Sequence, residues 1–173
     1  KKLKKLTELQ FRWATQSQLI EKLPQEWLPY MIDVGLLSNP PVTTFSKNSP
    51  RYVYWAASRY LTKCVSDYPN EITSVILNCN FQNEKDRNPT IYTDFLTCAI
   101  NLPISNIEKI GQKILDEKWY DFRENYWFTE KYVEVIERLY LAEKYDLAEK
   151  LFHNGFAPKL SEKITTMNIF EEP

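Results

Sequence analysis

Glycine, cysteine and histidine are scarce in this 173-residue sequence, which contains 3 Gly, 3 Cys and 1 His. So few glycines disfavour a sheet protein, which needs glycine in many tight turns. Gly35, Gly111 and Gly155 lie far apart, which excludes the usual glycine-rich phosphate-binding loop. His153 alone excludes a metal site with several histidines, and we interpret it as a structural residue near a helix C-terminus.

The cysteines and the apolar residues exclude further classes of protein. Cys64, Cys79 and Cys98 contain no C-x-x-C pair and fall at or near apolar helical positions, which predicts buried thiols. No apolar run approaches the roughly 20 residues that a helix needs to cross a bilayer. The opening residues, KKLKKL, include neither a Met nor the apolar core of a signal peptide, so we expect the chain to be part of a longer protein.

Aromatic residues are abundant, at 14% of the chain, and they suit packed helices whose gaps are filled by large side chains. The hydrophobic share of 43% and the charged share of 26% are ordinary for a globular protein. The length predicts one domain with a real core. The net charge of -1 gives no overall reason to expect a polyanionic partner.

The stretch from Ser49 to Ile76 has the pattern of a helical hairpin. Ser49 and Pro50 predict a capped helix start, Pro69 predicts its end, and Asn70 predicts the cap of a second helix. Apolar residues recur at three-and-four spacing, which places them on one face of each helix. These residues are Val53, Ala56, Ala57, Tyr60, Leu61, Cys64 and Tyr68 in the first helix, and Ile72, Val75, Ile76 and Cys79 in the second.

Two further hairpins follow. Asn88 and Pro89 predict the start of one, and Ser105 with Glu108 fits a capping box for its second helix. Thr129 predicts the cap of the last hairpin, which Gly155 ends. The residues expected in the core are Tyr92, Phe95, Leu96, Ala99, Leu102, Ile107, Ile110, Ile114 and Leu115, then Val133, Ile136, Leu139, Tyr140, Leu147, Ala148, Leu151 and Phe152.

The helix starts near Pro50, Pro89 and Glu130 recur at a spacing of about 40 residues, which is typical of HEAT and armadillo units. The sequence therefore predicts an all-α fold in which stacked helical hairpins form a short right-handed superhelix. An irregular compact helical bundle is the alternative. We expect a single domain over 1–173, with an N-terminal helical layer (1–37), hairpins at 49–80, 88–118 and 129–155, and a C-terminal tail (156–173).

Four segments between Trp27 and Pro103 carry a family resemblance: WLPYMIDVGLLSNPP, YWAASRYLTK, PNEITSVIL and NPTIYTDFLTCAINLP. Together they resemble HEAT-like helical segments of large multidomain bacterial proteins, some with an ATPase domain upstream. KYDLAEKLFHNGFAP, residues 144–158, is similar to the second helix of a TPR unit. The resemblance implies a helical-repeat fold and brings no catalytic signature, and we expect the protein to be cytoplasmic.

The run WYDFRENYWF, residues 119–128, holds the residue types that dominate binding hot spots. Its candidate partner-binding residues are Trp119, Tyr120, Phe122, Arg123, Tyr126 and Trp127. The other interpretation, which we favour, is that the run packs one hairpin against the next. We therefore predict that Trp119 and Trp127 are mostly buried between the second and third hairpins.

These patterns favour a non-catalytic protein-interaction or scaffold module of a larger intracellular protein, with no cofactor or metal site. The alternative is a helical-repeat module that binds nucleic acid, which KKLKK and the arginines Arg51, Arg59 and Arg123 favour and the near-neutral charge disfavours. A third hypothesis is an enzyme with a carboxylate site among Asp116, Glu117, Asp121 and Glu124.

The C-terminal tail contains apolar residues for which the sequence offers no partner helix: Ile164, Met167, Ile169 and Phe170. Because a stack of hairpins exposes an apolar face at an uncapped end, we expect the tail either to fold back over the third hairpin or to dock on a neighbouring module or chain.

Overall fold

The computed structural model describes residues 19–41, 43–46, 49–81 and 87–156. The described residues are mostly helical, as the sequence predicts. In chain order the elements are η1 (Gln25–Trp27), α3 (Leu28–Asp33), β1 (Thr44–Ser46), β2 (Ser49–Arg51), α4 (Ala56–Cys64), α5 (Pro69–Asn78), α6 (Pro89–Ile100), α7 (Ile104–Asp116), η3 (Trp119–Phe122), α8 (Tyr126–Leu141) and α9 (Tyr145–Phe156).

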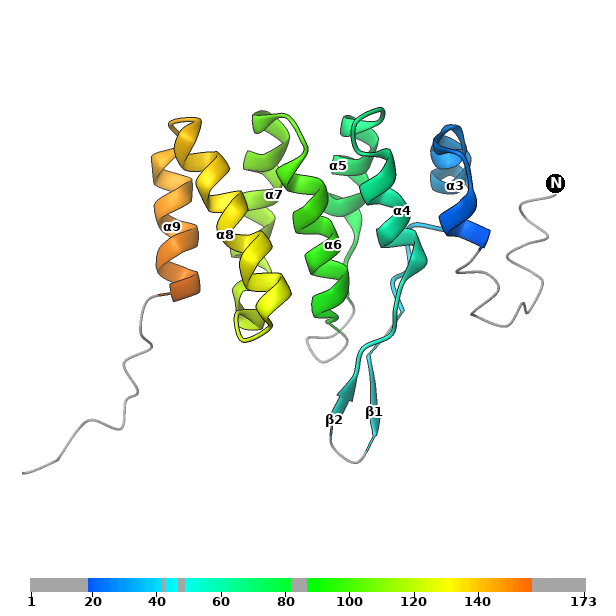
Figure 1. Ribbon diagram of the computed structural model, residues 1–173, viewed down its shortest axis with the longest axis horizontal. Helices are drawn as coiled ribbons and strands as arrows, with labels where there is room; N and C mark the ends of the chain where they lie inside the picture. Colours follow the sequence, from blue (N-terminus) through cyan, green and yellow to red (C-terminus); the bar gives the residue numbers. More distant parts are fainter. Residues whose placement is uncertain (1–18, 42, 47–48, 82–86, 157–173) are drawn as a thin grey trace, which may run out of the picture.

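The helices from α4 to α9 form two layers (Figure 1). Helices α4, α6 and α8 pack side by side in one layer, and α5, α7 and α9 pack in the same order in the other. Consecutive helices form hairpins, so each helix contacts its partner across the layers and its neighbours within a layer.

The start of α6 confirms the sequence prediction. Asn88 precedes Pro89, and the Asn88 Oδ1 atom accepts a hydrogen bond from the Thr90 amide at 3.0 Å. Proline suits the first helical position because no amide hydrogen is needed there. The Asn88 side chain also donates to the Val53 carbonyl at 2.7 Å, which fixes the helix start against the preceding segment.

The prediction that Ser49 and Pro50 open a helix is wrong. Ser49–Arg51 form strand β2, which pairs antiparallel with β1, and α4 begins only at Ala56. The sequence between them, Tyr52–Tyr54, is rich in the aromatic and β-branched residues that suit extended backbone. The strand pairing therefore outweighs the local cap signal, and Val53 lies before the helix instead of on its apolar face.

Three other helix boundaries differ from the prediction. Helix α4 ends at Cys64, and Pro69 is the first residue of α5 instead of the end of α4. Helix α7 begins at Ile104 without a side-chain cap, so the capping box expected at Ser105 does not form. Helix α8 is capped by Asn125, whose Oδ1 accepts from the Phe128 amide at 3.2 Å, so it begins before Thr129.

The core contains most of the predicted apolar positions. Tyr60, Leu61, Ile72, Ile76, Phe95, Ile110 and Ile114 are among those fully or almost fully buried. Cys64, Cys79 and Cys98 are buried and free, as predicted. Burial raises the pKa of the Cys79 thiol to about 12. Gly35 follows the end of α3 and has a φ of 74°, the left-handed conformation that glycine adopts there.

The apolar face of the last hairpin is an exception. Val133, Tyr140 and Phe152 were expected in the core, yet all three are exposed. Their spacing correctly identifies an apolar face, but in the part of the chain that the structure describes no neighbouring hairpin covers it.

A buried carboxylate links α4 to α6. Asp94 on α6 accepts a hydrogen bond from the Ser58 hydroxyl at 2.5 Å and forms an ion pair with Arg59 at 3.2 Å. Burial raises the pKa of Asp94 above its ordinary value of 3.8, although the bond from Ser58 and the charge of Arg59 partly oppose this effect. The ionised carboxylate is therefore held at a net cost in free energy.

Leu61→Ala should lower the free energy of unfolding by about 2 to 5 kcal/mol, because Leu61 is fully buried and truncation leaves a cavity. Urea denaturation measures the change. The control is Ser66→Ala, at an exposed turn position, which should stay within about 0.5 kcal/mol of wild type. Equal effects of the two substitutions would show that this face of α4 is not core.

Asp94→Asn tests the cost of the buried charge. A raised folded-state pKa means that the folded protein loses stability relative to the unfolded chain as Asp94 ionises. The wild-type free energy of unfolding, minus that of the Asn variant, should therefore fall as pH rises from below 3.8 through the raised pKa. A difference that rises with pH would show that the ion pair with Arg59 outweighs desolvation.

Candidate functional site

The structure divides the aromatic run 119–128 into a buried part and an exposed part. Trp119 is fully buried at the start of η3. Its ring centroid lies 4.4 Å from that of Tyr92 and 6.1 Å from that of Phe95, both on α6. Trp119 therefore packs the segment after α7 against α6.

The backbone and a carboxylate position the Trp119 side chain. Lys118 adopts a left-handed conformation, with a φ of 53°, at the turn between α7 and η3. The Trp119 indole Nε1 donates to Glu117 Oε2 at 2.8 Å, and Lys113 forms an ion pair with the other oxygen of Glu117. The Lys113 Nζ also donates to the Leu77 carbonyl at 3.1 Å, so this network reaches from η3 to the end of α5.

Tyr120, Phe122 and Arg123 are partly buried. The Phe122 ring lies 5.4 Å from Tyr92 and 6.1 Å from Phe128, so it bridges α6 and α8. The Nη1 atom of Arg123 is buried and has no hydrogen-bond partner among the described residues. These three residues belong mainly to the packing between hairpins.

Tyr126 and Trp127, in the first turn of α8, are exposed to 70% and 67%. Their rings meet edge to face, with centroids 5.3 Å apart and planes at 78°. The prediction that Trp119 is buried is confirmed, and the prediction that Trp127 is buried is wrong. Because α8 already begins at Tyr126, successive side chains point about 100° apart, and burial of Phe128 directs Trp127 outward.

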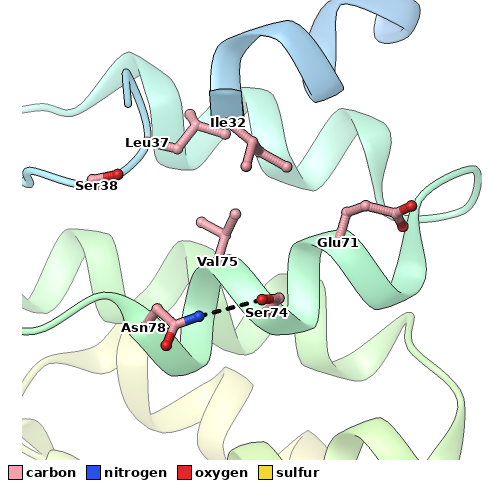
Figure 2. Close-up of a pocket in the computed structure, with 7 residues that line it drawn as sticks. All are labelled: Ile32, Leu37, Ser38, Glu71, Ser74, Val75 and Asn78. Carbon is pink, nitrogen blue, oxygen red and sulfur yellow. Dashed lines mark hydrogen bonds between the residues drawn. The ribbon is translucent and has the colours of Figure 1, made fainter. Parts of the chain in front are cut away.

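A first hollow lies between the segment after η1 and α5, with a volume of about 270 Å³ (Figure 2). Figure 2 shows Ile32 and Leu37 on one side and Val75 on the other. The nearby Asn78 donates to the Ser74 hydroxyl at 3.3 Å, so these two polar groups satisfy each other. The hollow contains no charged pair or nucleophile arranged for chemistry among its described residues.

A second hollow, of about 560 Å³, lies between α8 and α9 on the face away from α6 and α7. Its lining residues are Val133, Ile136, Glu137, Tyr140, Tyr145, Ala148, Glu149 and Phe152. Most of these apolar residues are positions that the sequence predicts for the core. One feature of the sequence does indicate that this face is exposed: α8 and α9 form the last predicted hairpin, so no predicted hairpin follows to cover it.

The arginines proposed to bind nucleic acid do not form one described patch. Arg51 lies on β2, Arg59 pairs with Asp94 on α6, and Arg123 is partly buried after η3. The basic KKLKK segment lies outside the described residues.

Three of the four carboxylates proposed for catalysis have structural partners. Glu117 is bound by Lys113 and Trp119, and Asp121 lies 3.6 Å from Arg87. Asp116 accepts from Gln112 at 2.9 Å. Among the described residues, no cluster of three or more His, Cys, Asp or Glu side chains could hold a metal ion.

The exposed His153 lies on α9, with its Nε2 3.6 Å from Glu149 Oε1. None of the described helices has both the length and the apolar character that crossing a membrane requires.

Comparisons with protein-family models, with curated proteins and with solved structures give no match to this chain. The resemblance of residues 27–103 to HEAT-like segments therefore stays a prediction.

Trp119→Ala and Trp127→Ala form a matched pair. The first should lower the free energy of unfolding by about 3 to 5 kcal/mol or prevent folding, because it empties a fully buried site and leaves Glu117 without its indole partner. The second should change it by no more than about 0.5 kcal/mol, because Trp127 is mostly exposed. Thermal and urea unfolding measure both, and a reversed order would contradict the division of the run.

Proposed function

We propose that this chain is a non-catalytic protein-interaction or scaffold module of stacked helical hairpins, and that Tyr126 and Trp127 form its contact site. The observation that carries the proposal is the exposed edge-to-face pair at the start of α8. Trp and Tyr are among the residue types most enriched in binding hot spots, and here the two exposed rings lie against each other.

The surroundings of the pair support this role. Behind it, Phe128 and Tyr132 are fully buried, with stacked rings 5.7 Å apart, so the pair stands on a rigid helix. Along the same helix, Lys131 lies 3.3 Å from Glu130 and 2.6 Å from Glu134. A rigid aromatic centre with a charged, mutually paired rim is the common anatomy of a protein interface.

The two helix layers support the stacked-hairpin part of the proposal. The first helices of the hairpins begin at Ala56, Pro89 and Tyr126, a spacing of roughly 35 residues, which is shorter than the sequence indicated and close to that of TPR units. The HEAT-like resemblance favours a place in a larger cytoplasmic bacterial protein, including one with an ATPase domain.

Nucleic-acid binding is the second candidate function, and the exposed aromatic pair is the observation that favours it. Bases stack on exposed Tyr and Trp side chains with little regard to sequence. The described arginines are dispersed or paired with acids, which weakens this candidate relative to a protein partner.

Site-specific photocrosslinking in the native host tests the contact site. A photoreactive phenylalanine analogue in place of Glu130, one helical turn from Trp127, should give a discrete protein adduct that Trp127→Ala removes. The control places the analogue at Tyr30, an exposed aromatic on α3, and should give no such adduct.

Two outcomes would contradict the proposal. Adducts that are absent at Glu130, or that persist in Trp127→Ala, would exclude the pair as the contact site. The nucleic-acid function would be established instead if the wild type binds a labelled single-stranded oligonucleotide, its affinity falls steeply with salt, and Trp127→Ala abolishes the binding.

A further inference from the structure

The hollow between α8 and α9 is shaped and lined like a place for one more helix. In the layer of α4, α6 and α8, each helix packs beside the previous one, and the hollow lies where the next helix would pack against α8. Its lining is apolar apart from two acidic residues, Glu137 and Glu149. Val133 and Tyr140 on one side are exposed to 46% and 60%, and Phe152 on the other to 54%.

The chain leaves α9 at one end of this hollow. Phe156 is the last described residue, and its ring lies 6.0 Å from Tyr132 and 5.5 Å from Phe152. The hollow extends from there along α8 toward Tyr140. A segment that reverses direction after Phe156 would therefore run through it, antiparallel to α9.

The residues that follow, 157–173, lie outside the described part of the chain, but their sequence has the required pattern. Leu160, Ile164 and Met167 recur at four and three residues, which puts them on one face of a helix. Lys159 and Lys163 flank the start of this face. Their charge is complementary to that of the acidic residues in the hollow.

The lengths also agree. The connections between consecutive helices range from three residues, at 101–103 and 142–144, to ten residues between hairpins, at 79–88, so a connection over 157–159 equals the shortest of them. A helix over 160–170 would be about 16 Å long, whereas the stretch from Val133 to Tyr140 is about 10 Å along its axis. The segment therefore spans the hollow without a long connection.

We propose that residues 160–170 form an amphipathic helix of this same chain that fills the hollow between α8 and α9. Leu160 packs near Val133, and Met167 packs near Tyr140. Lys163 lies beside Glu149, which the described residues pair with His153 at 3.6 Å. This helix covers the apolar end of the stack and leaves Trp127, on another side of α8, free for a partner.

Disulfide trapping in the full chain tests the proposal. Tyr140→Cys with Met167→Cys should form an intramolecular disulfide under mild oxidation, seen as a faster monomer band on non-reducing gels. The control, Tyr140→Cys with Thr165→Cys, has nearly the same tether but places the second thiol on the far side of the helix, so it should oxidise at least 10-fold more slowly. The native cysteines are buried and do not compete.

Each alternative has its own signature. Disulfide-linked dimers, with a yield that rises with protein concentration, would show that a second copy occupies the hollow. Equal and slow oxidation of the two cysteine pairs would show that the segment does not dock there. Both outcomes overturn the proposal, and neither bears on the photocrosslinking at Glu130.

A stability comparison adds an independent measurement. Ile164→Asp should lower the melting temperature by roughly 4 to 8 °C, because it places a charge against the apolar lining. Thr165→Asp, on the opposite face, should leave the melting temperature unchanged. Equal melting temperatures of the two variants would contradict the docking.

Discussion

The buried contact between Trp119 and Glu117 holds the middle of the structure together. The indole ring packs on Tyr92 and Phe95 of α6, while its N–H is bound by a carboxylate that Lys113 neutralises. Leaving the buried Trp119 N–H without an acceptor would cost about 1 to 3 kcal/mol, and the partly buried Glu117 neutralises the buried Lys113. Each group therefore depends on the others. Since Lys113 also reaches the carbonyl at the end of α5, one small network sets the position of three helices.

Buried polar groups with specific partners also occur at the other contacts between hairpins. Asp94 binds Ser58 and Arg59 between α6 and α4, and the buried Asn106 on α7 donates to Thr73 on α5 at 2.6 Å. Apolar faces slide over one another at little cost, whereas a buried polar group has few acceptable partners. We interpret these pairs as the contacts that fix the relative position of neighbouring hairpins, at the cost in free energy that the raised pKa of Asp94 reveals.

Features fixed by local sequence could be predicted, and features fixed by a neighbour could not. Asn88 and Pro89 start a helix as expected because cap and helix lie within a few residues. The same signal at Ser49 and Pro50 failed because a distant strand competes for that backbone. For the candidate site, composition is enough to single out the run 119–128. Which of its residues are buried and which are exposed depends on where α8 begins. That start is set by Asn125, whose cap places Phe128 inside and Trp127 outside.

Helix α8 explains why two surfaces remain open in the described chain. One face, with Tyr132, Val135 and Leu139, is buried in the core. A second face, with Val133, Ile136 and Tyr140, lines the hollow beside α9. Trp127 and Leu141 are also exposed, and they lie on neither of these two faces. Apolar side chains thus lie on more than one side of α8, between charged residues such as Glu130 and Glu134. The described residues bury only the side that faces the core. The proposed helix over residues 160–170 would cover the second face, and the proposed protein partner would cover Trp127.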